Sequence, residues 1–332
     1  MTTALVTGGA GFLGSHVADE LLAMGLRVVV LDDLSGGARA NVPAGATFVE
    51  GSVVDHALVD RLFAEHRFDA VFHLAAYAAE GLSHFIKRFN YTTNLVGSVN
   101  LINAAVNAGT VRCFVFTSSI AVYGPGQVPM RESVTPTPVD PYGIAKYAVE
   151  LDLAEAREMF DLNFVVFRPH NVYGERQQIG DRYRNVIGIF MNQILKGEPM
   201  TVFGDGEQTR GFTHVSDVAP LIARSIERPA VWNQVFNVGA DTPHRVNELA
   251  VAVAAAMGVT PRVVHLDARN EVEHAFSDHA KTRAAFGDLM KGVTLAQGLA
   301  RMAAWVRKVG ARDWTAFTGI EVTKNLPPSW RP

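Results

Sequence analysis

The sequence predicts a doubly wound parallel α/β sheet together with a second, smaller α/β domain. In the first half of the chain, short apolar runs alternate with segments long enough to form crossover helices. The run at 28–31, Val-Val-Val-Leu, is apolar on both faces, as expected of a parallel strand covered by helices on each side. A length of 332 residues, 48% of them hydrophobic, suggests about two domains.

The predicted elements follow this alternation in order. We expect strands at 4–7, 27–32, 47–50, 70–74, 113–118 and 164–168. The crossover helices expected between them cover 12–24, 56–66, 94–108 and 142–160. In the less regular second half we expect helices at 185–196, 215–227, 246–257 and 295–308, and strands at 200–203 and 235–239.

The expected strand at 235–239 indicates that the two domains are not separated by a single cut. This strand looks like a further member of the first sheet, so the chain would cross between the domains more than once. We therefore assign 1–170 and about 235–262 to the first domain. The second domain would comprise about 171–234 and 263–332.

Composition and charge narrow the class of protein. A net charge of -3 and a sequence pI near 6.4 give no electrostatic basis for binding nucleic acid or an anionic membrane. Cys113 is the only cysteine, so no intrachain disulfide can form. The chain starts on a strand-like run rather than a leader, and no apolar run approaches the ~20 residues that span a bilayer. We expect a cytoplasmic protein without a metal, because the histidines lack ligand spacing.

A glycine-rich loop joins the first expected strand to the first helix. Gly8 permits a tight turn, Gly11 lets backbone amides approach a pyrophosphate, and Gly14 lets the helix pack closely on the sheet. The helix N-terminus offers N–H groups and a partial positive charge to the phosphates. Asp32 ends the second strand, where a carboxylate accepts the adenosine ribose hydroxyls and repels a 2'-phosphate. Unless Asp32 is only a solvated turn residue, the loop predicts a Rossmann-type site for NAD.

A serine, a tyrosine and a lysine predict the chemistry. Ser119 follows the fifth expected strand, and Tyr142 and Lys146 lie four residues apart on one helix face. A phenol with a pKa near ~10 is a poor base, but a neighbouring ammonium group and a positive nicotinamide ring favour the phenolate. Ser119 can hydrogen-bond the same substrate hydroxyl. A Tyr-x-x-x-Lys pair is common by itself; combined with the loop and the serine it predicts an active site.

These residues together resemble the extended short-chain dehydrogenase/reductase family, and within it the nucleotide-sugar epimerases and dehydratases. The resemblance covers nearly the whole chain and includes the segments 73–76 (HLAA), 94–97 (NLVG), 168–174 (RPHNVYG), 202–206 (VFGDG), 236–239 (FNVG) and 277–281 (SDHAK). It implies a nucleotide-sugar substrate, with uridine as the expected nucleotide, and bound NAD.

The loop, the strand ends and this resemblance define the expected site residues. The expected NAD site comprises Gly8, Gly11, Phe12, Leu13, Gly14, Asp32, Ser35, Ser52, Val53, Leu74, Ala75, Ala76, Asn94, Thr117, Tyr142, Lys146 and Pro169. The expected substrate site comprises Glu80, Ser119, Tyr142, Asn171, Asn185, Val186, Phe203, Arg210, Arg269 and Ala275. A guanidinium fork matches phosphate oxygens, although either arginine would also suit a surface salt bridge.

The residues after the serine discriminate between the reactions of the family. By the resemblance, dehydratases and decarboxylases carry an acidic residue there, whereas Ile120 and Ala121 are neither acid nor base. The family's 3,5-epimerases use an active-site cysteine, and Cys113 is expected to be a buried filler instead. The resemblance thus implies epimerisation at C4 through a 4-keto sugar. A dehydratase, a net 4-reductase and a non-catalytic NAD(H)-sensing protein are the alternatives.

Four positions and one segment depart from the family pattern. Ser52 stands where an aspartate usually contacts adenine, and Gly211 where an aspartate usually follows the arginine. Glu80 is an unusual charge near the expected sugar, and Ala275 replaces the bulky aromatic of enzymes restricted to unsubstituted hexoses. The segment 175–184, with Arg176, Arg182 and Arg184, is richer in charge than the usual loop, which would suit either a sugar with a carboxylate or a solvated loop. The sugar is therefore open between a hexose, a uronic acid and an N-acetylhexosamine. By the same resemblance, the helices expected at 94–108 and 142–160 would pair in a homodimer.

Overall fold

The computed structural model describes residues 2–268, 272–314 and 317–330, and its main feature is a seven-stranded sheet. The strand order is β11-β6-β5-β4-β1-β2-β3, and every neighbouring pair is parallel. The strands are β1 (Thr3–Thr7), β2 (Arg27–Asp32), β3 (Thr47–Glu50), β4 (Ala70–His73), β5 (Cys113–Thr117), β6 (Phe164–Pro169) and β11 (Gln234–Val238). The late strand thus joins the first sheet, as predicted.

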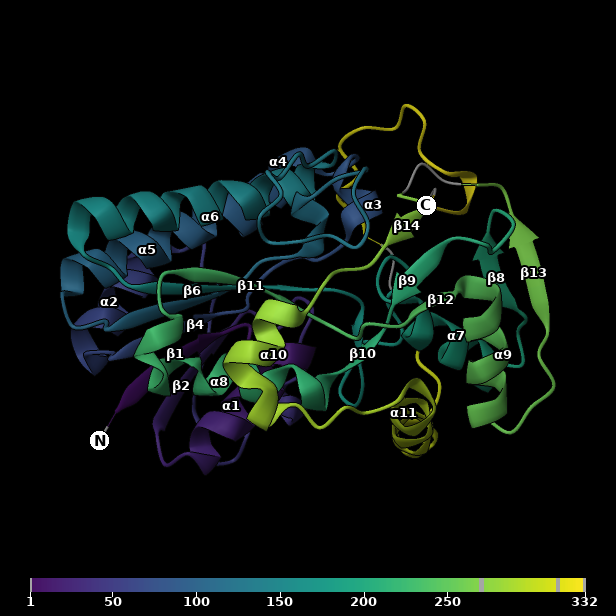
Figure 1. Cartoon of the computed structure of the whole chain (residues 1–332), viewed down its shortest axis with the longest axis horizontal. Helices are drawn as coiled ribbons and strands as arrows, with labels where there is room; N and C mark the ends of the chain where they lie inside the picture. The colour runs from purple at the N-terminus through teal and green to yellow at the C-terminus, as the bar shows by residue number, and fades with distance from the viewer. Residues whose placement is uncertain (1, 269–271, 315–316, 331–332) are drawn as a thin grey trace.

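Helices cover both faces of this sheet (Figure 1). Successive side chains of a strand point to opposite faces. Val28 and Val30 accordingly belong to the apolar core beneath one helical layer, and Val29 and Leu31 to the core beneath the other. The first layer contains α1 (Phe12–Ala23), α8 (Ala219–Arg224) and α10 (Ala280–Phe286); the second contains α2 (His56–His66), α5 (Gly97–Ala108) and α6 (Pro141–Phe160). The predicted doubly wound fold class is confirmed.

Two expected helices differ from the prediction. The helix expected at 94–108 begins with a π-helical turn, Thr92–Val96, before α5. The helix expected at 215–227 is shorter, because α8 is flanked by 3-10 turns on both sides. Pro220 has no N–H and therefore favours a new helix start at α8 over a continuous helix from Val215.

A smaller α/β part lies beyond the carboxyl ends of the main strands (Figure 1). Its helices pack around one apolar core. It contains α7 (Val186–Leu195), α9 (Val246–Ala256), α11 (Leu295–Val309), and the strands β7 (Val172–Tyr173), β8 (Met200–Phe203), β9 (Thr209–Gly211), β10 (Thr213–His214), β12 (Pro243–Arg245), β13 (Val263–Leu266) and β14 (His274–Ala275). Within the described ranges, no helix is both long and apolar enough to cross a membrane.

Packing groups some elements differently from the expected domain boundaries. α8 contacts α1, and α10 contacts β11. Both helices therefore pack in the layer that covers one face of the main sheet, although they fall in the expected second domain. α9 contacts α7 and α11 although it falls in the expected first domain. The division into two functional domains stays a prediction. By packing alone, α8, β11 and α10 belong to the first part and α9 to the second.

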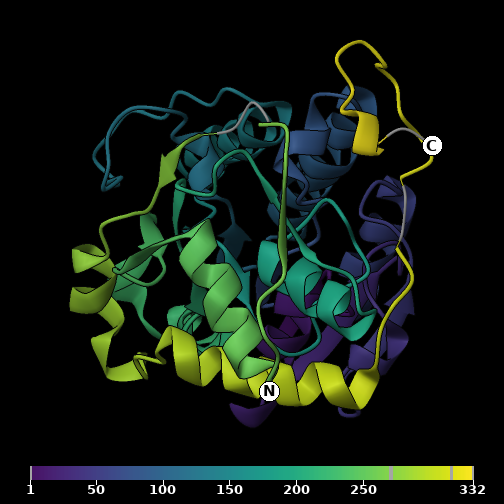
Figure 2. The same cartoon turned by 90° about the vertical axis from the view of Figure 1, so that its right-hand side faces the viewer.

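The last described segment, 317–330, returns across the molecule to two short helices (Figures 1 and 2). These helices are α3 (Glu80–Ser83) and α4 (Lys87–Tyr91). Phe317 stacks edge-on against Phe89 with ring centroids 4.9 Å apart. Trp330 packs against Phe85 and Tyr183 and is 6% exposed. The segment therefore packs both against the region of α3 and α4 and against Tyr183.

Candidate active site

A cavity of about 1670 Å³ lies where the carboxyl ends of the main strands face the smaller part. Ligand sites in doubly wound sheets lie at this edge. A pocket for a single small ligand has roughly 300–1,000 Å³, so this cavity has room for two ligands side by side. Of the expected site residues that the structure describes, all except Asn94 line the cavity. Arg269 lies outside the described residues.

The glycine loop has the geometry that a phosphate cradle requires. Gly8 has a φ of +70°, which side chains rarely adopt. A Cβ on Gly14 would lie 2.1 Å from the Gly8 carbonyl oxygen, so only glycine permits this approach of α1 to the loop. Gly11 precedes α1, and no side chain caps the first turn of the helix. The amides of this turn therefore remain available to an anion.

Asp32 lines the cavity and is 8% exposed, so it is more than a solvated turn residue. Its two carboxylate oxygens accept hydrogen bonds from the amides of Ala10, at 2.9 Å, and Leu34, at 2.8 Å. Burial raises the pKa of Asp32, and these two amides act in the opposite direction. Each oxygen retains a second lone pair, so the carboxylate can still accept ribose hydroxyls.

Asn94 differs from its expected role as a wall of the NAD site. It is 1% exposed and does not line the cavity. Its Oδ1 accepts from the Tyr77 amide at 2.8 Å, and its Nδ2 donates to the Tyr77 carbonyl at 3.1 Å and to Asn90 at 2.8 Å. Asn94 therefore holds the backbone of Tyr77, which does line the cavity.

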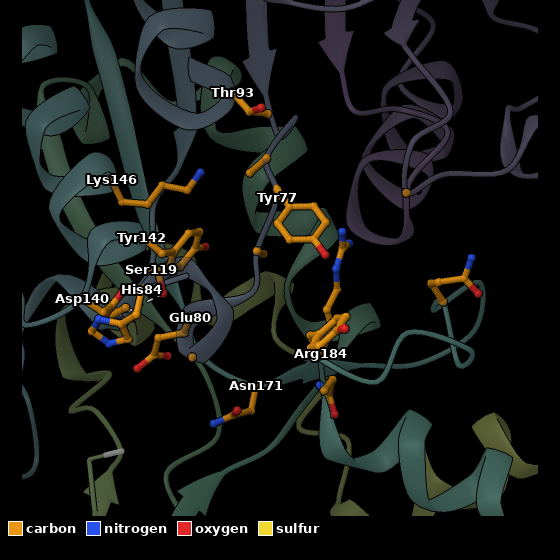
Figure 3. A pocket seen from close by; sticks show the side chains of 18 of the residues that line it. Tyr77, Glu80, His84, Thr93, Ser119, Asp140, Tyr142, Lys146, Asn171 and Arg184 are labelled. Atoms are coloured by element: carbon orange, nitrogen blue, oxygen red, sulfur yellow. Dashed lines mark hydrogen bonds between the residues drawn. The ribbon is translucent and has the colours of Figure 1, made fainter. Parts of the chain in front are cut away.

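Ser119, Tyr142 and Lys146 lie together on one side of the cavity (Figure 3). Asp140 caps α6 by accepting from the Gly143 amide at 2.8 Å, which places Tyr142 in the first turn. Ser119 forms a hydrogen bond with the Tyr142 phenol. The Lys146 Nζ donates to the Thr117 carbonyl at 2.8 Å and lies 5.9 Å from the centre of the Tyr142 ring.

Burial governs the protonation of both catalytic candidates. It raises the pKa of Tyr142, the hydrogen bond with Ser119 lowers it, and the charge of Glu80 raises it further. Burial lowers the pKa of Lys146 to about 7, and Glu150 acts in the opposite direction. Tyr142 thus remains a phenol at neutral pH in the protein alone, and its conversion to a base depends on a nearby cation.

Several of the expected substrate residues belong to the smaller part, among them Asn185, Arg210 and Ala275. Ala275 of β14 pairs with Arg210 of β9, so the two positions are direct neighbours across parallel strands. The Arg210 guanidinium donates to three backbone carbonyls, among them those of Val272 and Glu273. Asn185 caps α7 by accepting from the Ile187 amide at 3.0 Å. Asn185 and Val186, at the start of α7, both line the cavity.

The cavity is also lined by residues outside the two expected sets of site residues. Tyr77 and Arg184 face each other, with the guanidinium carbon 4.8 Å from the ring centroid (Figure 3). His84 lies beside Asp140, and burial raises the pKa of the Asp140 carboxyl while His84 lowers it. Asp140 was accessible to sequence reasoning, because an aspartate directly before a proline is a helix-start signal. Tyr77 and His84 carry no such local signal, and the only signal for Arg184 is the charge-rich segment 175–184.

Known proteins match this chain over most of its length. The family model described as NAD dependent epimerase/dehydratase family matches residues 4–239. A UDP-glucose 4-epimerase of Mycolicibacterium smegmatis is 37% identical over 311 residues, covering 91% of this chain and 98% of the relative.

Two solved structures are similar in fold as well as in sequence. A UDP-glucose 4-epimerase of Thermotoga maritima with UDP-glucose has a TM-score of 0.88 and 36% identity, over 93% of this chain and 99% of that one. A UDP-glucose 4-epimerase of Thermus thermophilus in complex with NAD has a TM-score of 0.85 and 34% identity, over 92% and 99%. The predicted family is confirmed: the chain belongs to the NAD dependent epimerase/dehydratase family.

Proposed function

We propose that this protein inverts C4 of a UDP-linked sugar with NAD as a bound cofactor. The observation that carries the proposal is the grouping of Ser119, Tyr142 and Lys146 beside a glycine-loop cradle in one cavity. The relatives named UDP-glucose 4-epimerase support the reaction, and the Thermus thermophilus complex supports the cofactor. The single cysteine, which is buried, is consistent with a cytoplasmic location, which stays a prediction.

The residues present suit NAD. The uncapped first turn of α1 would bind the pyrophosphate, Asp32 would accept the ribose hydroxyls, and Lys146 and Pro169 would line the nicotinamide end. The cofactor supplies one chemical capacity, the uptake and return of a hydride at C4. The carboxylate of Asp32 disfavours the 2'-phosphate of NADP.

Tyr142 moves the proton of the reacting hydroxyl. A cationic nicotinamide ring and a charged Lys146 would offset the burial that raises the pKa of Tyr142, so that the phenolate takes the proton of the C4 hydroxyl. Ser119 holds the same hydroxyl in line. The resulting 4-keto sugar must turn before Tyr142 returns the proton to the other face. Arg210 and the N-terminus of α7 would anchor the diphosphate during that turn.

The cavity wall near Ala275, where the sugar would lie, suits more than one hexose. Ala275 contributes only a methyl group to the cavity, so it leaves room for a substituent such as an N-acetyl group. Arg184 and Glu80, of opposite charge, both line this cavity. We therefore propose to test UDP-glucose, UDP-N-acetylglucosamine and UDP-glucuronic acid together.

Replacement of Tyr142 by phenylalanine tests the proposal. We expect about 10²- to 10⁴-fold slower turnover, the usual contribution of a general base, with bound NAD retained. Tyr147→Phe is the matched control, because Tyr147 lies on the same helix but outside the cavity. Near-normal turnover by Tyr142→Phe would contradict the assignment.

Analysis of the products separates the proposed reaction from its rivals. Epimerisation conserves the mass of the nucleotide sugar, dehydration removes one water, and reduction consumes external NADH. A non-catalytic NAD(H)-sensing protein would bind the dinucleotide and turn over none of the three sugars.

We also propose that the protein is a homodimer. Ile144, Leu151 and Met159 are 42%, 54% and 65% exposed on α6, at spacings that place them along one side of the helix. Such a stripe is typical of a helix that packs against a second copy. Light scattering of the purified chain tests the proposal, and Leu151→Glu is expected to yield monomers.

A further inference from the structure

Two buried histidines meet at the junction between the main sheet and the smaller part. His170 follows β6 and His279 precedes α10, and they are 2% and 0% exposed. Their Nε2 atoms lie 3.0 Å apart, the ring centroids lie 5.1 Å apart, and the ring planes differ by 17°, so the two rings meet end to end. The proposed reaction uses neither side chain.

The other nitrogen of each ring determines how many protons the pair holds. Nδ1 of His170 lies 3.0 Å from the Gly211 carbonyl oxygen, which can only accept, so this Nδ1 carries hydrogen. Nδ1 of His279 lies 2.8 Å from the Asp241 carboxylate, which also binds Arg283, so this Nδ1 carries hydrogen too. Two neutral rings would then point bare Nε2 lone pairs at each other. A hydrogen bond between the Nε2 atoms requires one additional proton.

Glycines make the space for this pair. A Cβ on Gly239 would lie 1.7 Å from Nε2 of His170, and a Cβ on Gly211 would lie 2.3 Å from its Cε1. A larger residue at either position would displace the ring. Gly211 directly follows Arg210 on β9, so the ring of His170 connects the end of β6 to the strand that carries Arg210.

We propose that His170 and His279 share one proton between their Nε2 atoms and thereby position Arg210 in the substrate cavity. With the proton present, the two rings are joined and His170 holds the Gly211 carbonyl. When the pH rises and the proton leaves, the opposed lone pairs repel and the rings separate. The link from β6 to β9 is then lost. Both histidines are positioning residues, because they act through Arg210.

The charged groups around the pair favour one proton. Asp241 and Glu132 are negative and stabilise a cationic pair, whereas Arg283 opposes it. Asp278, the residue before His279, is also negative, and His279 contributes to lowering the pKa of its carboxyl. A pair with one proton is thus balanced by the Asp241 carboxylate that touches it.

Burial excludes a second proton. Burial, followed by the charge of His279, lowers the pKa of His170 to about 3. Burial also lowers the pKa of His279, and the hydrogen bond to Asp241 acts in the opposite direction. The pair therefore holds at most one proton, and it loses that proton as the pH rises.

The first experiment does not depend on the proposed function. The full chain is labelled with ¹⁵N-histidine and its spectra are recorded from pH 5 to pH 8, with His279→Gln used to assign the signals. We expect two of the eleven histidines to share an intermediate Nε2 shift and to titrate together. Bare Nε2 signals for both residues throughout the range would overturn the proposal.

The second experiment rests on the proposed function and measures KM for UDP-glucose against pH. We expect KM to rise about fivefold as the shared proton is lost, which corresponds to ~1 kcal/mol for one hydrogen bond, with little change in kcat. The amide of His279→Gln donates to His170 at every pH, so its KM should stay flat. His214→Gln replaces an equally buried histidine outside the pair and should keep the wild-type profile.

The two experiments fail in different ways. An unchanged pH dependence of KM in His279→Gln would overturn the positioning role. Absence of turnover with every nucleotide sugar would refute the proposed function, while the spectra would still test the shared proton.

Discussion

Replacement of Glu150 by glutamine tests how a buried ion pair supports the active site. Glu150 lies on α6 one turn after Lys146. Its carboxylate accepts from Arg168 at 3.0 and 2.5 Å and from the Ser118 hydroxyl at 2.5 Å. Both charged side chains are only 4% exposed. Glutamine has nearly the same shape, so the change removes the charge and leaves the packing in place.

The expected cost follows from this burial. Removal of one partner of a buried pair leaves an uncompensated charge, which typically costs about 3–5 kcal/mol. That is a large part of the ~5–15 kcal/mol by which proteins are stable. The matched control is Asp161→Asn, which breaks the Arg157–Asp161 pair, where the aspartate is 91% exposed. An exposed pair of this spacing contributes about 0.5 kcal/mol or less.

Two measurements check the prediction. Equilibrium unfolding in urea should show the large loss for Glu150→Gln and almost none for the control. Glu150 also raises the pKa of Lys146, so its removal lowers that pKa below about 7. Lys146 then loses its charge at lower pH, and the decline of kcat on the alkaline side should begin earlier. A Glu150→Gln protein as stable as the control would refute the reasoning.

Four further predictions concern the cavity. Lys146→Met removes a cation beside the phenol, so Tyr142 becomes a base only at higher pH; the acid limb of kcat should move upward by about one unit. Gly14→Ala puts a Cβ 2.1 Å from the Gly8 oxygen, and the purified protein should carry little NAD, as its absorbance spectrum will show. Asp32→Ala removes the charge that repels a 2'-phosphate and should raise NADP affinity about tenfold relative to NAD in calorimetry. Trp330→Ala removes a buried ring from the cavity wall and should raise KM for the nucleotide sugar severalfold without changing kcat.

Much of the fold was predictable because its signals are local. The run from Val28 to Leu31 is continuously apolar, and the expected range 27–32 matches β2. The break before α8 was not predicted, because Val215, Val218 and Ile222 recur at the spacing of one continuous helix and only Pro220 marks the new start. Where α9 packs was also hidden, since its apolar face does not identify the layer that covers it.

The candidate site divides in the same way. Gly8, Ser119 and Tyr142 are recognisable because each stands at a fixed place beside one predicted strand or helix. Those places bring all three residues to the cavity. Tyr77 and Arg184 reach it only through tertiary contacts between segments about a hundred residues apart. Asn94 is expected to line the cavity, but its side chain instead hydrogen-bonds the backbone of Tyr77, a residue that does line it. The sequence spacing of Asn94 is the same for both roles, so it does not distinguish them.

The late position of β11 in the sequence has a consequence for how the chain folds as it is made. The ring of Phe167 on β6 packs against Phe236 of β11 and Phe286 of α10, with centroids 6.0 and 5.8 Å apart. At a synthesis rate of about 5–20 residues per second, β6 waits several seconds for these partners as an open, apolar sheet edge. A fragment ending after β6 would keep that edge permanently. Such a fragment is therefore expected to aggregate when it is expressed alone.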